Sequence, residues 1–351
     1  MGGLSTSAGA SAAGGTSGQP LRVAVVGAGW MGETHLRSYA AQHGVRIVGL
    51  VTRSPGRAAE LAARYPIEAT FDDVETMLDA VSPDGISVTT GEHDHVGPVQ
   101  AALERGFGVL VEKPMASNLE DALRIAEAAS RSEAILVPAH VLRFTQPYRA
   151  LVEQVRAGRL GAVRAIASRR DRTRAIAERY GHVHPALVTS VHDIDLVMWI
   201  TGLRVRRVRA LESRREGAPQ PDLIWAQLEL EDGVIASVST ATLHPKDGSI
   251  ASSDRLEVYG DEGVAAVDLS TPLLSIQTRQ PILPDWLFEP TDGGGAFGTE
   301  IGHFCDCLRR GRASDVVTVD EAVAGIRVAE AMIRSAAGGG AVVDPGAGTP
   351  A

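Results

Sequence analysis

Lys113 is the residue of this sequence whose side chain is best suited to exchanging protons at a reaction site. The chain has 34 lysine and arginine residues, and only Lys113 and Lys246 among them are lysines. Arginine stays protonated in proteins, whereas burial can lower the pKa of a lysine towards neutral pH. Since the chain uses arginine for almost every other cation, we predict that Lys113 does what arginine cannot and takes part in proton transfer.

His192 is the second candidate for acid–base chemistry. It lies in a stretch predicted to be helical over residues 185–201, where at about 3.6 residues per turn it shares a stripe with Val188, Asp195 and Trp199. A lone histidine on a helix is usually structural, so this assignment depends on Lys113 and on the cofactor motif described next. An unperturbed imidazole pKa of about 6.5 suits taking a hydroxyl proton or returning it.

The first expected strand covers residues 21–27. A glycine-rich turn follows it and leads into a helix predicted over residues 30–43. It reads Gly27-Ala28-Gly29-Trp30-Met31-Gly32, a GxGxxG pattern. In a dinucleotide-binding turn the first glycine permits the sharp turn, the second lets the backbone approach a pyrophosphate, and the third lets helix and strand pack closely. Because strand and helix flank the pattern as the motif requires, we predict that these residues bind a dinucleotide.

The end of the second expected strand bears on the choice of cofactor. An NAD site usually places a carboxylate here, where it accepts a hydrogen bond from the ribose 2′-hydroxyl. This chain instead offers Thr52, Arg53, Ser54 and Arg57. Two hydroxyls and two guanidinium groups suit a 2′-phosphate, so the pattern favours NADP over NAD. The alternative interpretation is an ordinary solvated loop.

Short apolar strands alternate with helices from residue 21 to about residue 142. Strands are predicted over 21–27, 46–52, 85–90, 108–112 and 135–139, and helices over 30–43, 55–65, 74–81, 96–105 and 118–131. This alternation predicts an α/β Rossmann domain, a parallel sheet covered by helices on both faces. Residues 1–20 are mostly Gly, Ser, Ala and Thr, a composition that predicts a disordered tail.

Residues 143–345 have a different pattern and form a second predicted domain. Longer strands follow one another over 163–171, 205–213, 223–231, 234–243, 254–260 and 263–268, with helices over 185–201, 298–310 and 319–335. Turn sequences such as Glu231-Asp232-Gly233 join the later strands as hairpins would. The second domain is therefore predicted to be α+β, with an open and mostly antiparallel sheet.

Several motifs, taken together, resemble the Gfo/Idh/MocA family of oxidoreductases over residues 21–340. The most specific is Glu112-Lys113-Pro114 after a parallel strand, and the others are Thr90-Gly91-Glu92-His93-Asp94-His95, His140-Val141-Leu142-Arg143-Phe144, His192-Asp193-Ile194-Asp195 and Ile301-Gly302-His303-Phe304. The resemblance implies a Rossmann domain followed by a substrate domain that commonly pairs its sheets into homodimers or homotetramers. It also implies hydride transfer between NAD(P) and a secondary alcohol of a sugar, cyclitol or sugar nucleotide.

The resemblance also implies roles for individual residues. Lys113 takes the position of the lysine that hydrogen-bonds the reacting hydroxyl, and His192 that of the catalytic histidine. Thr90, His95, Glu112 and Lys113 are expected at the cofactor. Arg143, within the motif at residues 140–144, is a candidate substrate contact.

Two further candidate substrate contacts come from the residues themselves and not from the resemblance. Arg170 lies in the arginine-rich run 169–174, which would contact an anionic substrate such as a phosphate or nucleotide sugar; a solvated strand end is the alternative. Trp286, in a proline-rich loop, would stack on a sugar ring, and simple loop packing is the alternative.

Val188 departs from the family pattern, because many members have an aspartate one turn before the histidine. Asp195, one turn after the histidine, is one candidate to replace that aspartate. Otherwise His192 works with Lys113 alone, or Tyr180 or Asp171 supplies the missing function; Tyr180 is also a candidate substrate contact. Two other functions stay open: a redox-neutral hydrolase or lyase that retains its nicotinamide, and an inactive protein that only binds the cofactor.

Composition excludes several other classes of protein. The formal net charge of −9 argues against a nucleic-acid partner, and no apolar run approaches the ~18 residues of a membrane span. Two cysteines are too few for a disulfide framework, and with no export signal they favour a cytoplasmic protein. His182, His184 and His192 lack a carboxylate or cysteine at ligand spacing, so no metal is expected.

Overall fold

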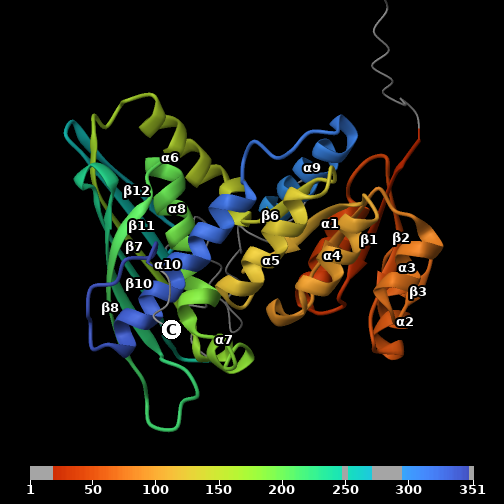
Figure 1. Cartoon of the computed structure of the whole chain (residues 1–351), viewed down its shortest axis with the longest axis horizontal. Helices are drawn as coiled ribbons and strands as arrows, with labels where there is room; N and C mark the ends of the chain where they lie inside the picture. The colour runs from red at the N-terminus through yellow and green to blue at the C-terminus, as the bar shows by residue number, and fades with distance from the viewer. Residues whose placement is uncertain (1–18, 247–251, 271–294, 348–351) are drawn as a thin grey trace, which may run out of the picture.

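The computed structural model describes residues 19–246, 252–270 and 295–347. Within them, two six-stranded sheets lie towards opposite ends of the molecule, with helices between and around them (Figure 1). Most of the predicted tail and the predicted substrate contact Trp286 lie outside the described residues. None of the described helices is both long and apolar enough to cross a membrane.

The first sheet is parallel and has the strand order β3-β2-β1-β4-β5-β6. Its strands are β1 (Leu21–Val26), β2 (Val45–Val51), β3 (Thr70–Phe71), β4 (Gly85–Val88), β5 (Gly108–Glu112) and β6 (Leu136–Ala139). Their residues are nearly all buried, because helices cover both faces. The predicted Rossmann sheet is confirmed. The short β3, two residues long, was not predicted, since so few residues show no periodicity.

Five helices flank this sheet: α1 (Trp30–Ala40), α2 (Pro55–Arg64), α3 (Val74–Val81), α4 (Val96–Glu104) and α5 (Leu119–Ser130). Polar side chains fix where three of them begin, because Ser54, Asp73 and Asn118 each accept a backbone hydrogen bond at a helix start. The helix predicted over 30–43 is shorter than expected and ends at Ala40, before the left-handed turn at Gly44.

A helix from the far end of the chain completes the Rossmann core. α9 (Gly295–Arg310) packs against α1, and its Ile301 and Phe304 join the same buried cluster as Leu36 and Tyr39. Cys305 of α9 lies in this cluster too, and burial raises the pKa of its thiol to about 12. This thiol is therefore protonated at neutral pH, which makes it a poor nucleophile.

The second sheet has the strand order β12-β11-β7-β10-β9-β8. Its strands are β7 (Val163–Thr173), β8 (Val205–Ser213), β9 (Leu223–Leu230), β10 (Ile235–His244), β11 (Ser252–Gly260) and β12 (Gly263–Asp268). β7 and β10 are parallel and the other neighbours are antiparallel, so the prediction of a mostly antiparallel sheet is confirmed. Buried and exposed residues alternate along β9 and β10, which is the pattern of a sheet with one covered face.

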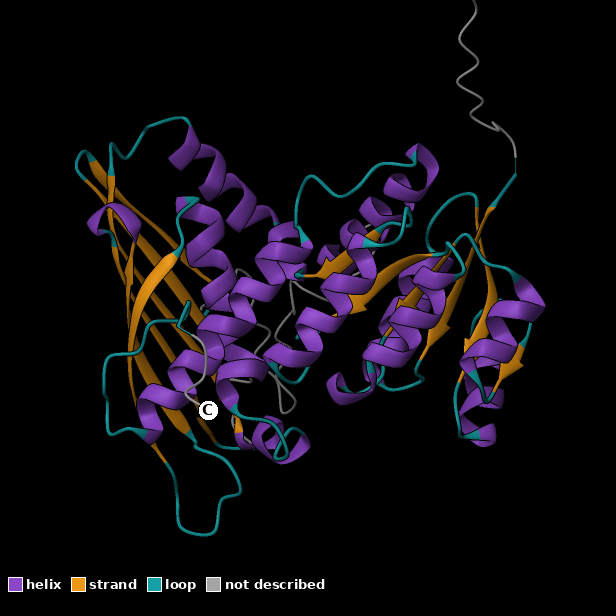
Figure 2. Cartoon of the chain, viewed as in Figure 1, coloured by secondary structure: helices purple, strands orange, loops and turns teal. Residues whose placement is uncertain are grey.

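Helices lie along one face of this sheet, on the side towards the Rossmann half (Figure 2). They are α6 (Gln146–Arg156), α8 (Val191–Thr201) and α10 (Val319–Ala337), and α7 (Arg174–Arg179) follows β7. α6, α7 and the short turn η2 (Val141–Phe144) were not predicted. The single helix predicted over 185–201 is wrong in its first turns, because Ala186–Ser190 form a wider π turn before α8 begins.

Candidate active site

The glycine-rich turn after β1 has the shape that a dinucleotide pyrophosphate requires. A Cβ added to Gly27 would lie 2.8 Å from the backbone of Thr89, and one added to Gly32 would lie 2.0 Å from the Gly27 carbonyl oxygen. A Cβ on Gly29 would meet nothing within 4 Å. Gly29 is also the N-cap of α1 and offers no side-chain cap, so the first backbone N–H groups of α1 face an open space suited to an anion. The residues present therefore fit the predicted cofactor.

The four polar residues after β2 are not equally available to a 2′-phosphate. The Thr52 hydroxyl accepts from the backbone of Ser54 at 3.3 Å, and the Ser54 hydroxyl caps α2. Arg57 donates to the Ala28 carbonyl at 3.1 Å and pairs with the carboxylates of Glu33 and Glu60. The side chain of Arg53 is 91% exposed and reaches an acid, Asp94, only at 4.0 Å. Of the predicted set, Arg53 is the side chain with the most freedom to bind an anion.

Lys113 lies at the carboxyl end of β5, one residue beyond the strand, and contacts the second half of the molecule. Its Nζ donates to the backbone carbonyl of Val188 at 2.9 Å. Burial lowers the pKa of Lys113 to about 8, with the positive charges of Arg172 and Arg170 acting in the same direction and Glu112 opposing them. A lysine with this pKa exchanges its proton near neutral pH, which is what the sequence led us to expect.

His192 lies in the first turn of α8, half-buried and close enough to Lys113 for the lysine's charge to act on it. Burial lowers its pKa well below the usual value, and the positive charges of Lys113, Arg170 and His140 lower it further. The expectation of an unperturbed pKa is therefore wrong. No carboxylate stands at position 188 to oppose these charges, and the imidazole is neutral at neutral pH. Val188 contributes a buried apolar side chain and the carbonyl that receives Lys113.

The side chains of Arg143 and Arg170, which were predicted as substrate contacts, are buried and pair with carboxylates of the protein instead. Arg143 donates to Asp195 at 2.7 Å and to Glu321 at 3.0 Å, and its side chain is fully buried. Arg170 donates to Asp193 at 2.9 Å and to Asp254 at 2.6 Å. These ion pairs tie β7, α8 and α10 together. Both arginines therefore hold the site's framework, and Asp195 is unavailable as a substitute for the missing aspartate.

The two residues proposed to replace that aspartate differ in position. Tyr180 lines a cavity of about 280 Å³ together with Val188 and Thr189, and burial raises the pKa of its hydroxyl. Asp171 is buried and accepts from Arg169 at 2.6 Å. Tyr180 is thus a protonated hydrogen-bond donor beside the π turn, whereas Asp171 already has a partner.

Glu112 and His95 hold the loops around Lys113. Glu112 accepts from the Lys113 backbone N–H at 3.1 Å and is 3.0 Å from Nε2 of His35 on α1. The two ring nitrogens of His95 lie 3.1 Å from the Thr90 carbonyl and 3.2 Å from the Met115 carbonyl. His35 was missed by the sequence reasoning, because a histidine inside the helix after a glycine-rich turn gives no signal of a partner 77 residues away.

Glu300 of α9 is a second functional candidate that the sequence did not indicate. It lies close to His35 and Glu112 and is fully buried. Neither of its carboxyl oxygens has a hydrogen-bond partner among the described residues. Burial and the charge of Glu112 raise the pKa of Glu300 well above the usual value, so this carboxyl group keeps its proton to a higher pH than an ordinary glutamate does.

Two family models match the chain and divide it as the sheets do. One is described as an oxidoreductase family with an NAD-binding Rossmann fold and matches residues 21–140. The other, described as the GFO/IDH/MocA C-terminal domain, matches residues 148–266. The chain belongs to the GFO/IDH/MocA oxidoreductase family. The predicted resemblance is therefore confirmed over most of the described residues.

Individual relatives cover almost the whole chain. Inositol 2-dehydrogenase from Acidothermus cellulolyticus is 26% identical over 305 residues, which are 84% of this chain and 86% of that protein. Rhizopine catabolism protein MocA from Rhizobium meliloti is 26% identical over 321 residues, 89% of this chain and 93% of that protein. The structure of scyllo-inositol dehydrogenase from Lactobacillus casei with bound NAD(H) and scyllo-inositol superposes with a TM-score of 0.83 at 19% identity, covering 94% of this chain and all of that one. At that identity the superposition shows the common fold.

Proposed function

We propose that this member of the family is an NAD(P)-dependent dehydrogenase that oxidises a secondary alcohol of a cyclitol or sugar and reduces the corresponding ketone. The observation that carries the proposal is Lys113, with a pKa of about 8, at the carboxyl end of β5 in the same sheet as the glycine cradle. Ligands of open parallel sheets bind beyond the carboxyl ends of the strands. The relatives named as inositol dehydrogenases support a polyhydroxylated substrate.

The bound nicotinamide would supply the acceptor or donor of a hydride, and the chain's own residues would handle the proton. In the oxidation direction, neutral Lys113 accepts the hydroxyl proton at Nζ. The Val188 carbonyl, 2.9 Å from Nζ, keeps that atom directed towards the π turn. His192 stays neutral and takes part as a hydrogen-bonding partner of the reacting oxygen, because its pKa is too low for it to carry the proton.

We also propose that the enzyme prefers NADP to NAD, and this preference depends on Arg53. The related structure contains NAD(H), but the acid that usually selects NAD is absent after β2 of this chain. A 2′-phosphate would give the exposed Arg53 guanidinium a dianionic partner. Titration of NAD and NADP into wild type and Arg53→Ala tests this: NADP should bind more tightly to wild type, and the difference should shrink in the variant. Equal or tighter NAD binding by wild type would reject the preference.

Self-association through the open sheet is proposed as well. Ile235, Ala165, Tyr259 and Val264 are directly paired across four strands and form an apolar row on the uncovered face. Ile235, Tyr259 and Val264 are 57%, 38% and 59% exposed. Exposing several large apolar side chains to water on one face is energetically unfavourable. A second copy of the chain would cover this row, in a homodimer or homotetramer.

A cytoplasmic location is also proposed, because the two cysteines are buried free thiols and not disulfides.

The experiment is a screen of inositols, other cyclitols and sugars with NAD and with NADP, following the absorbance of reduced nicotinamide. Wild type should oxidise at least one member of the panel, and Lys113→Ala should lower kcat by about 10²-fold or more while cofactor affinity is kept. The redox-neutral and inactive alternatives gain no support from the relatives, which are named as dehydrogenases. Cofactor binding without turnover on the whole panel would reject the proposal.

A further inference from the structure

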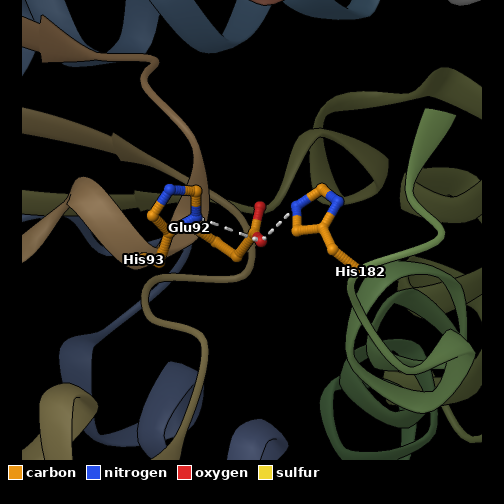
Figure 3. Close-up of side chains that lie close together, drawn as sticks. All are labelled: Glu92, His93 and His182. Atoms are coloured by element: carbon orange, nitrogen blue, oxygen red, sulfur yellow. Dashed lines mark hydrogen bonds and ion pairs between the residues drawn. The ribbon is translucent and has the colours of Figure 1, made fainter.

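Two histidines and a glutamate from the two halves of the molecule meet outside the catalytic pair (Figure 3). Glu92 and His93 belong to the short turn η1 (Glu92–Asp94), which follows β4. His182 lies 90 residues later, between α7 and the π turn. The carboxylate of Glu92 points between the two imidazoles, with Oε1 3.1 Å from His182 Nε2 and 3.7 Å from His93 Nδ1.

We propose that Glu92, His93 and His182 bind a divalent transition-metal ion such as Zn²⁺. One donor atom from each of the three residues lies within 4.8 Å of the other two. Zinc bonds of about 2.0–2.2 Å in a tetrahedron place neighbouring ligand atoms about 3.3 Å apart. The separations of Glu92 from His182 and from His93, 3.1 Å and 3.7 Å, are close to this spacing. Two imidazoles and one carboxylate are a zinc ligand set that leaves a fourth position open.

The surroundings of His93 fit a metal ligand. Its second ring nitrogen, Nε2, is 3.6 Å from the Asp94 carboxylate. Metal-bound histidines usually direct their other nitrogen to such a group, which fixes the ring and increases its basicity. The ring of His93 is perpendicular to that of His182, with centroids 6.0 Å apart, so the two rings do not stack and both nitrogen edges can converge.

The exposure of the three residues allows an ion to enter. Glu92 is buried at the base of the cluster, whereas the side chains of His93 and His182 are 58% and 55% exposed. An ion there would connect the end of β4 to the segment after α7 and so bridge the Rossmann half and the substrate half. Glu92 also acts electrostatically on Lys113 and Tyr180, which places the bridge beside the candidate active site. The proposal does not depend on the proposed dehydrogenase activity.

No metal was predicted from the sequence, because His182, His184 and His192 lack a carboxylate or cysteine at ligand spacing. The structure separates them. His184 lies 3.1 Å from Glu212, and the carboxylate that completes the cluster around His182 comes from the Rossmann half. The alternative explanation of the cluster is a plain hydrogen bond or ion pair between Glu92 and His182.

Zinc binding to the full-length protein, stripped with a chelator, tests the proposal directly. Isothermal titration and elemental analysis after dialysis should show one saturable Zn²⁺ per chain. His182→Ala and Glu92→Gln should each weaken binding by about 10²-fold or more, and Asp94→Asn by about 10-fold, because it orients a ligand. The exposed His43 provides a matched control, and His43→Ala should bind like wild type.

Two further measurements keep the result interpretable if a variant is unstable. Co²⁺ provides a spectroscopic probe, because a four-coordinate site gives strong visible absorption that His182→Ala should lose. Zn²⁺ should also raise the Tm of wild type and of His43→Ala but not that of His182→Ala. An absence of saturable binding by wild type, or binding that is the same in His182→Ala and Glu92→Gln, would overturn the proposal and leave a simple Glu92–His182 ion pair.

Discussion

The pKa of Lys113 leads to a quantitative prediction for the pH dependence of the reaction. With a folded pKa of about 8, the neutral form of Lys113 makes up about 9% of the molecules at pH 7 and about 90% at pH 9. If neutral Lys113 is the proton acceptor, kcat for alcohol oxidation should rise about tenfold between these pH values and then level off. A lysine with its ordinary pKa of about 10.4 would give a rise of nearly 100-fold with no plateau in this range.

Initial rates of oxidation at saturating cofactor and substrate, measured from pH 6.5 to pH 10, provide the assay, with enzyme stability checked at each pH. Reduction of the ketone should show the opposite trend, because protonated Lys113 is then the donor. Lys113→Arg keeps the positive charge but cannot release a proton, so it should lower kcat by about 10²-fold or more and abolish the pH-dependent rise. A rate that does not level off by pH 9, or a Lys113→Arg variant with normal kcat, would refute the assignment.

Three other outcomes follow from the structure. Val188→Asp places a carboxylate beside Lys113 and His192, so it should raise the pKa of both and move the oxidation profile to higher pH; an unchanged profile would show that position 188 does not face the site. Burial raises the pKa of Glu300 in the folded state, so the folded protein keeps a proton on this carboxyl group that the unfolded chain releases above about pH 4.5. The contribution of Glu300 to the free energy of unfolding therefore falls as the pH rises above that value. Urea denaturation at pH 5 and pH 8 should therefore show a weaker loss of stability for Glu300→Gln than for wild type. Ile235→Lys should shift light scattering towards the monomer at micromolar concentration, and an unchanged mass would place the interface elsewhere.

The fold was predictable because its signals are local. The apolar strands of the Rossmann sheet and the alternating strands of the second sheet show their burial pattern in consecutive residues. The π turn before α8 was not predictable, because its apolar residues, among them Leu187 and Val188, also fit an ordinary helix. That turn nevertheless decides which backbone carbonyl receives Lys113.

Within the site, only the features with a local signal in the sequence were predictable. Lys113 stood out by its rarity, and the glycine turn by its spacing. The roles of Arg143 and Arg170 depend on carboxylates that are 52 and 23 residues away in the sequence, and no local pattern reveals them. The low pKa of His192 likewise arises from positive charges that the fold collects around it. Partners of this kind become visible only when tertiary structure brings distant segments together.

Hydride transfer between the substrate and the nicotinamide can be followed with an isotope label. A cyclitol or sugar that the wild-type enzyme accepts is labelled with deuterium at the reacting carbon, and the reduced cofactor is analysed by mass spectrometry. If the enzyme transfers a hydride, we expect one deuterium in the reduced nicotinamide for each ketone formed. Product that accumulates while the added cofactor stays oxidised and unlabelled would contradict it.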